Sequence, residues 1–168
     1  MFYIQLIGLV AFSLLVLSYY KKKPATILLY QVAANFAYAV HYFLLGGLSG
    51  AFTSLIGIFR NIALIRLKSI ESKKLLAVLV ILCYFGITLV FYENFYSIFP
   101  MIANSTYLLI MLKGSRKALI VGGIVSSTFW LLYAIFELSY AGMLTESIVI
   151  ISNTIQLIRL KNEKSTNC

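Results

Sequence analysis

Positive charge in this chain is confined to short clusters, and the apolar stretches between them are long enough to cross a bilayer once or twice. Four clusters hold thirteen of the fourteen Lys and Arg residues. They are Lys21 to Lys23; Arg66, Lys68, Lys73 and Lys74; Lys113, Arg116 and Lys117; and Arg159, Lys161 and Lys164, with Arg60 as the outlier. Cytoplasmic loops of membrane proteins carry an excess of Lys and Arg. If all four clusters face the cytoplasm, the chain crosses the membrane an odd number of times and begins outside.

Composition supports a membrane protein. Hydrophobic residues make up 61% of the chain and charged residues 11%, which leaves too little polar surface to cover a soluble domain. The net charge of +9 is therefore interpreted as a topology signal and as contact with anionic lipids. A nucleic-acid-binding protein would instead carry its basic face on a soluble fold.

Seven apolar runs are each close to the roughly 20 residues that a transmembrane helix needs. They cover residues 2–20, 24–45, 50–67, 75–92, 95–112, 118–136 and 141–160. The intervening turns at 46–49, 93–94 and 137–140 contain no Lys or Arg, so basic and non-basic connections alternate along the chain. We therefore predict an all-α membrane protein with seven transmembrane helices, its N-terminus outside and its C-terminus cytoplasmic.

The chain also contains an internal repeat. The pentapeptide at 64–68 recurs unchanged at 157–161, at an offset of 93 residues. A one-residue slip pairs Gly50 with Gly142, Thr53 with Thr145 and Asn61 with Asn153. Either register aligns helices one to three with helices five to seven and leaves the fourth as a connector. We predict two parallel three-helix repeats at 1–68 and 93–161, a linker at 69–92 that includes the fourth helix, and a cytoplasmic tail at 162–168.

This 3+1+3 plan resembles the sugar-facilitator (SWEET) and PQ-loop superfamily. The resemblance implies a substrate site at the repeat interface, and the positions of Asn61 and Asn153 resemble those of substrate-binding Asn residues on the third and seventh helices of the sugar facilitators. Trp130 likewise resembles a facilitator residue that stacks on a ring. The chain departs from that pattern because it lacks the Pro-Gln dipeptide and has two prolines, Pro24 and Pro100, in place of four helix-kinking ones.

A second resemblance covers almost the whole chain. The segments 40–46, 50–52 and 142–146, together with the residues that follow them at Arg60, Arg66, Asn153 and Arg159, are similar to the YgjV family of bacterial inner-membrane proteins. The resemblance implies a multi-pass protein of the bacterial inner (cytoplasmic) membrane. It implies no particular substrate or activity.

Charged and titratable side chains inside the predicted helices are candidates for function, because polar groups at membrane depth are costly and usually face a bundle interior. Arg60 lies about 15 Å of helix rise from Gly50, near the middle of the third helix. We expect it to share a charged cavity with Glu146 and His41. Alternatively, Arg60 extends to the cytoplasmic interface and His41 is a hydrogen-bonded interfacial residue.

Five uncharged residues form the predicted substrate site: Asn61, Asn104, Trp130, Asn153 and Tyr38. Tyr38 belongs to a polar stripe on the second helix with Gln31, Asn35 and Tyr42, and Trp130 to a stripe on the sixth with Ser126, Tyr133 and Glu137. The Asn amides would donate and accept hydrogen bonds, and Trp130 would stack on a sugar or base ring. The alternatives are interhelical hydrogen bonds without a ligand for the Asn residues, and a packing or interfacial role for Trp130.

Enzyme chemistry has little support, because the chain has one histidine, no aspartate, no metal-ligand cluster and no phosphate-binding loop. We expect no enzyme activity, no cofactor and no metal. The favoured function is a SWEET-like transporter or facilitator of a sugar, nucleoside, vitamin or carboxylate. The alternatives are a non-transporting membrane scaffold or accessory subunit, and a small channel. The expected partners are the bilayer, with anionic lipids at the basic loops, and a small-molecule substrate; no nucleic acid is expected, and homo-oligomerisation is left open.

The predicted topology has a direct test. A reporter fused after Cys168 is expected in the cytoplasm, and a reporter inserted at Gly47 or Glu137 is expected outside, because the basic clusters stay inside. Reporter activity and protease protection measure both positions. An external C-terminus would overturn the helix count and the parallel repeat together.

Overall fold

The computed structural model describes residues 1–19, 21, 23–111 and 116–166. Lys22 and Lys113 of the basic clusters, and the reporter position at Cys168, lie outside the described residues.

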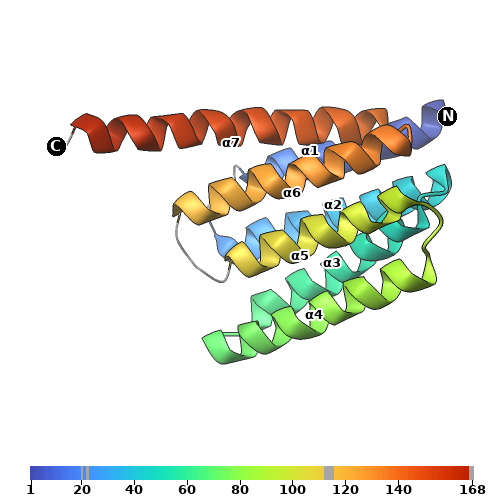
Figure 1. Cartoon of the computed structure of the whole chain (residues 1–168), viewed down its shortest axis with the longest axis horizontal. Coiled ribbons are helices and arrows are strands. Elements are labelled where there is room, and N and C mark those ends of the chain that lie inside the picture. The colour runs from blue at the N-terminus through green and yellow to red at the C-terminus, as the bar shows by residue number, and fades with distance from the viewer. Residues whose placement is uncertain (20, 22, 112–115, 167–168) are drawn as a thin grey trace.

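Within these residues the chain forms seven α-helices and one 3-10 helix, which lie side by side along one axis (Figure 1). The elements are α1 (Phe2–Tyr19), α2 (Pro24–Leu45), α3 (Leu48–Arg66), α4 (Ile70–Val90), η1 (Phe95–Ile98), α5 (Phe99–Met111), α6 (Arg116–Phe136) and α7 (Tyr140–Thr166). Five of the helices, α2, α3, α4, α6 and α7, are long and apolar enough to cross a membrane, and α1 and the η1–α5 segment are shorter apolar helices. The all-helical class and the count of seven helices are confirmed.

Two helix boundaries differ from the sequence prediction by five residues or more. α4 begins at Ile70 rather than near residue 75, because the Ser69 hydroxyl accepts a hydrogen bond from the Ser72 backbone N–H (3.0 Å) and caps the helix. The first turns of α4 are therefore helical, and Lys74 lies 3.5 Å from Glu71 across one of them. The second difference is at the C-terminal end of α7. This helix continues to Thr166, into the segment predicted as a tail, and projects beyond the neighbouring helices in Figure 1.

The connections alternate between the two ends of the bundle. The N-terminus and the α2–α3, α4–η1 and α6–α7 connections lie at one end, which we call the N-terminal end (Figure 1). The described members of the four basic clusters lie at the opposite end, which we call the basic end. Basic and non-basic connections therefore occupy opposite ends of the bundle.

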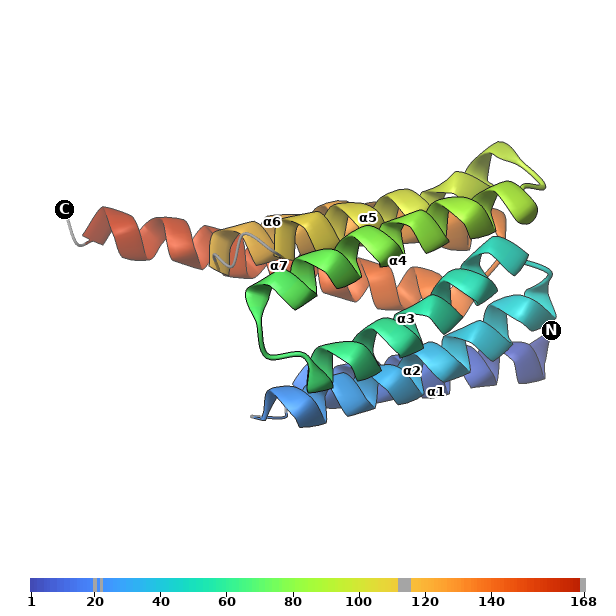
Figure 2. The same ribbon diagram turned by 90° about the horizontal axis from the view of Figure 1, so that it is seen from below.

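The helices pack as two groups of three. α2 packs against both α1 and α3, and α6 packs against both α5 and α7, while α4 contacts α3 and α5 (Figure 2). α1 also touches α7, so the two groups meet on a second side. α4 thus lies between the groups, on the side away from α1 and α7.

The α2–α3 and α6–α7 turns have the same backbone geometry. Gly46 (φ 93°) and Leu138 (φ 52°), 92 residues later, both adopt left-handed conformations. The hydrogen bonds also correspond: Gly46 N–H to Phe43 C=O and Gly47 N–H to Tyr42 C=O in the first turn, Leu138 N–H to Ile135 C=O and Ser139 N–H to Ala134 C=O in the second. This is the register that pairs Gly50 with Gly142.

Glycine is favoured in the first of these turns, because a residue with a Cβ is more strained at the φ of 93° of Gly46 than at the φ of 52° of Leu138. Gly46→Ala is expected to destabilise the protein by about 1–2 kcal/mol. The control is Gly86→Ala in α4, where a Cβ meets no heavy atom within 4 Å, so the change is expected to be neutral or stabilising. Thermal unfolding in detergent measures both, and equal losses of stability in the two variants would contradict the preference for glycine at residue 46.

Candidate functional site

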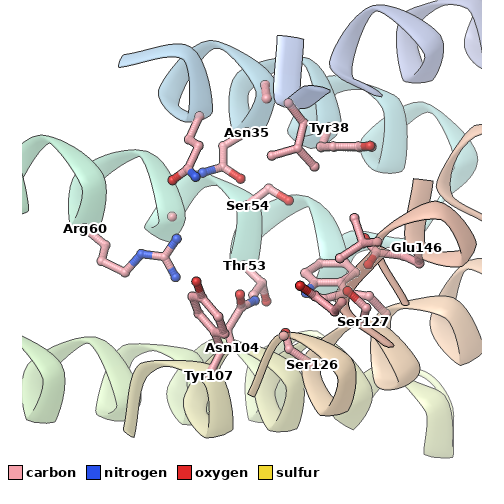
Figure 3. A pocket seen from close by; sticks show the side chains of 18 of the residues that line it. Asn35, Tyr38, Thr53, Ser54, Arg60, Asn104, Tyr107, Ser126, Ser127 and Glu146 are labelled. Carbon is pink, nitrogen blue, oxygen red and sulfur yellow. The ribbon is translucent and has the colours of Figure 1, made fainter. Parts of the chain in front are cut away.

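A cavity of about 450 Å³ lies between the two helix groups. Among the described residues, every α-helix except α4 contributes to its lining. The polar lining residues are Gln31, Asn35, Tyr38 and Tyr42 of α2; Thr53, Ser54 and Arg60 of α3; Asn104 and Tyr107 of α5; Ser126, Ser127 and Trp130 of α6; and Glu146, Asn153 and Gln156 of α7. Figure 3 shows part of this lining. Polar groups from both helix groups therefore converge on one space.

Six of the eight predicted site residues line this cavity: Tyr38, Arg60, Asn104, Trp130, Glu146 and Asn153. Their binding of a ligand remains a prediction. Asn61 and His41 do not line it, and each has a different structural role.

Asn61 is buried beside Arg60 and does not reach the cavity. Its Oδ1 accepts a hydrogen bond from Arg60 Nε (3.1 Å), and its Nδ2 has no partner among the described residues. Consecutive helical side chains point about 100° apart, and of this pair only Arg60 lines the cavity. Asn61 is thus placed to orient Arg60.

His41 lies at the N-terminal end, fully buried and outside the cavity. Its Nδ1 is 2.8 Å from the Ile4 carbonyl oxygen, and its Nε2 is 2.7 Å from Ser139 Oγ. A carbonyl only accepts, so Nδ1 donates, and a neutral ring then accepts at Nε2 from the Ser139 hydroxyl. Ser139 Oγ in turn accepts from the Gly142 backbone N–H (3.1 Å). His41 therefore ties α1 and α2 to the α6–α7 turn.

Tyr133 makes the reverse connection from the second helix group to the first. Its hydroxyl accepts hydrogen bonds from Ser49 Oγ (3.1 Å) and the Gly50 backbone N–H (3.0 Å), and donates to the Glu137 carboxylate. A Cβ on Gly50 would overlap the Tyr133 ring, so glycine is needed for this approach. Tyr133 follows His41 by 92 residues, the offset that separates the two matched turns. The two side chains thus form reciprocal ties between the groups.

Aromatic rings pack in the space between the hydrogen bonds of His41 and those of Tyr133. Tyr42 stacks on Trp130, with ring centroids 5.7 Å apart, and on Tyr38 at 6.2 Å. Tyr133 meets both Tyr42 (5.3 Å) and Trp130 (5.8 Å). We call Tyr38, Tyr42, Trp130 and Tyr133 the aromatic cluster; it lies between the cavity and the N-terminal end. Trp130 therefore packs within this cluster and also lines the cavity.

Arg60 and Glu146 line the same cavity but do not form an ion pair with each other. The ion pair found among the described residues is that of Lys74 with Glu71. Arg60 donates to Asn61 and, through Nη1, to the Tyr84 hydroxyl at 3.4 Å, whereas Glu146 interacts with the Ser127 hydroxyl. Figure 3 shows Arg60 and Glu146 apart, on different sides of the cavity.

Helix packing explains this separation. Asn35 of α2 lies level with Gly57 of α3, since a Cβ on Gly57 would be 3.0 Å from the Asn35 amide nitrogen. Tyr38 bonds to Thr145, next to Glu146, at 2.7 Å. Tyr38 is nearly one turn from Asn35 toward the N-terminal end, and Arg60 nearly one turn from Gly57 toward the basic end. Glu146 is one residue from Thr145 toward the basic end, so the two charged residues differ in level by about 7–8 Å.

Two lining residues that the sequence reasoning missed follow predicted ones by three positions. Tyr107 follows Asn104 on α5, and Gln156 follows Asn153 on α7. Residues three apart share a helix face, so this spacing could have identified both. As for metals, no group of three His, Cys or carboxylate side chains gathers within the described ranges.

Sequence comparison defines the family. The model of a family described as "Imp-YgjV: Bacterial inner membrane protein" matches residues 2–164. The chain belongs to this family. It is therefore a multi-pass protein of the bacterial inner membrane, as the YgjV resemblance implied. Comparison with curated proteins and with solved structures gave no match.

The Tyr133 tie has a measurable contribution to stability. Tyr133→Phe removes the acceptor of a buried backbone N–H, which is expected to cost about 1–3 kcal/mol. Tyr140→Phe, at a residue that is 62% exposed, is the control and is expected to change little. Thermal unfolding in detergent measures both variants. A Tyr133→Phe protein as stable as the parent would show that the tie is dispensable.

Glu137, just beyond the α6 span, gives a pH-dependent prediction. Burial raises the pKa of its carboxyl, nearby Glu93 raises it further, and the Tyr133 hydrogen bond opposes the shift. A raised pKa means that the folded protein holds this proton to higher pH than the unfolded chain, so the group's stabilising contribution is lost as pH rises through the raised pKa. The melting temperature of Glu137→Gln relative to the parent is therefore expected to increase from about pH 4 to about pH 8. Parallel pH profiles of the two proteins would contradict this.

Proposed function

We propose that this protein is a transporter or facilitator of a small metabolite, with the cavity between its two helix groups as the substrate site. The observation that carries the proposal is the convergence of polar side chains from five helices on one space inside an apolar bundle. Polar groups in a membrane protein interior are costly and mark substrate pathways. A volume of about 450 Å³ falls within the roughly 300–1,000 Å³ usual for small-molecule sites.

The matched halves of the chain support a two-unit mechanism. The α2–α3 and α6–α7 turns share one hydrogen-bond pattern, and the Thr53 to Ser49 C=O and Thr145 to Ala141 C=O bonds also correspond. Parallel repeats of this kind transport by rocking against each other around a central site. In this proposal the repeats are 1–68 and 93–161, and 69–92 is the linker.

The reciprocal ties of His41 and Tyr133 are suited to act as the gate at the N-terminal end. They join the two groups by hydrogen bonds that can break and reform without disturbing either group's own helices. With the basic clusters cytoplasmic, the N-terminal end faces outside. The gate is then closed to the outside, and anionic lipids contact the basic end.

Within the site, Asn104 and Asn153 supply amides, Tyr38 a hydroxyl, and Trp130 an aromatic surface. These groups suit a sugar, nucleoside, vitamin or carboxylate. Asn153 lies against Gly123, where a Cβ would be 2.6 Å from its amide nitrogen. The amide is therefore held close to α6 and is pre-positioned for a ligand between α6 and α7.

The test compares a variant that fills the cavity with one that does not. Ser126 lines the cavity, whereas Thr128, two residues along α6, is exposed on the bundle surface. Proteoliposomes with the parent protein, Ser126→Trp or Thr128→Trp are incubated with a metabolite extract, and the accumulated solutes are identified by mass spectrometry. We expect at least one solute to enter saturably with the parent and Thr128→Trp, and at least tenfold more slowly with Ser126→Trp.

The other functions give different results in the same assay. A scaffold or accessory subunit gives no solute accumulation with any of the three proteins. A channel gives uptake that rises linearly with concentration. Either result would remove the transporter proposal.

A further inference from the structure

We infer that the cavity takes a small zwitterion, with an anionic group at Arg60 and a protonated amine at Glu146. This inference rests on the proposed function and names the substrate class of the same site. It starts from an unexpected arrangement: two side chains of opposite charge line one cavity in an apolar bundle, yet they do not pair with each other.

Arg60 is prepared to receive an anion. Its guanidinium has five N–H donors. Among the described residues it donates to two neutral acceptors, Asn61 Oδ1 through Nε and the Tyr84 hydroxyl through Nη1. Both acceptors lie outside the cavity lining, so they anchor the guanidinium from behind. Figure 3 shows the guanidinium directed into the cavity. A planar, anchored fork of this kind suits two-point binding of a carboxylate.

Glu146 is prepared to receive a cation. Its carboxylate interacts with the Ser127 hydroxyl, a neutral partner that satisfies part of its hydrogen-bonding capacity. The aromatic rings of Tyr42 and Trp130 line the cavity nearby. A carboxylate beside aromatic faces is a favourable environment for an ammonium group, because the ring faces also attract cations.

The groups between the two charges are neutral and polar. Thr53, Ser54 and Asn104 line the cavity in the region between Arg60 and Glu146 (Figure 3). They can hydrogen-bond the middle of a ligand or the waters around it. The level difference of about 7–8 Å between the charged residues leaves room for a short ligand that contacts both.

Charge balance favours a dipolar ligand over a singly charged one. With both side chains ionised, Arg60 and Glu146 sum to zero, so a zwitterion leaves the site neutral and pairs each charge. An anion alone would pair Arg60 and leave Glu146 uncompensated, and an amine alone would do the reverse. An unpaired buried charge is strongly unfavourable, so the zwitterion is expected to bind more tightly than either half of it.

The test uses matched probes that differ in charge. 4-Aminobutanoate is compared with butanoate, 1-butylamine and glucose by isothermal titration against the purified full-length protein, and glycine and 6-aminohexanoate vary the spacing of the charges. We expect at least one of the three amino acids to bind at least tenfold more tightly than butanoate and 1-butylamine. This comparison needs no variant, so it holds even if a substitution prevents folding.

Variants then assign each end of the ligand. Arg60→Gln is expected to reduce amino-acid binding at least tenfold and to leave the binding of 1-butylamine unchanged. Glu146→Gln is expected to reduce amino-acid binding at least tenfold and to leave the binding of butanoate unchanged. Arg66→Gln and Glu93→Gln, at exposed residues outside the cavity lining, are the charge-matched controls and are expected to bind like the parent.

Two outcomes separate this inference from the proposed function. If glucose binds, the amino acids bind no better than their singly charged halves, and Ser126→Trp abolishes binding, the cavity is a substrate site for neutral solutes and the zwitterion inference is wrong. If no probe binds and the Ser126→Trp and Thr128→Trp proteoliposomes behave alike, both the inference and the transporter proposal are wrong.

Discussion

The way in which the two helix groups pack depends on the hydrogen bonds that join them at the N-terminal end. His41 reaches from the first group to Ser139 in the second, and Tyr133 reaches back to Ser49 and Gly50. In a bilayer, where most exposed side chains are apolar, hydrophobic burial does not distinguish helix contacts from lipid contacts. Internal hydrogen bonds and close packing therefore decide how the groups meet. Because they meet at this end, the polar lining residues are enclosed between them.

Glycines at the contact points make this close approach possible. Gly50 lies under the Tyr133 ring, and Gly142 faces the Tyr42 hydroxyl, where an added Cβ would be 2.8 Å away. The two glycines occupy equivalent positions in the two groups. The occurrence of glycine at both positions thus has a geometric reason, because each group needs a small residue where a tyrosine of the other group packs. This correspondence is the strongest structural support for the proposed duplication.

Much of the fold could be predicted from the sequence, because apolar runs and charge clusters are local signals. The seven helices and the inner-membrane location were predicted in this way and are confirmed. The start of α4 was wrong because the capping bond of Ser69 is not visible in hydropathy. The residues of the candidate site were harder to predict from the sequence. Depth in the helix placed Asn104 and Asn153 at the cavity, but the levels of Arg60 and Glu146 depend on how α2, α3 and α7 pack. Sequence alone could not exclude Asn61, because adjacent helical residues such as Thr53 and Ser54 both line the cavity. The bond of His41 to Ser139 joins residues too far apart in the sequence to predict.

We propose that the two helix groups move against each other around the cavity. Pulsed electron paramagnetic resonance between spin labels at Leu44 on α2 and Tyr140 on α7, both exposed at the N-terminal end, measures this most directly. In lipid nanodiscs the parent protein is expected to show a short distance, and the His41→Ala and Tyr133→Phe double variant is expected to populate a second, longer distance as the gate opens. A single unchanged distance in a variant that remains folded would contradict the account and favour a rigid scaffold.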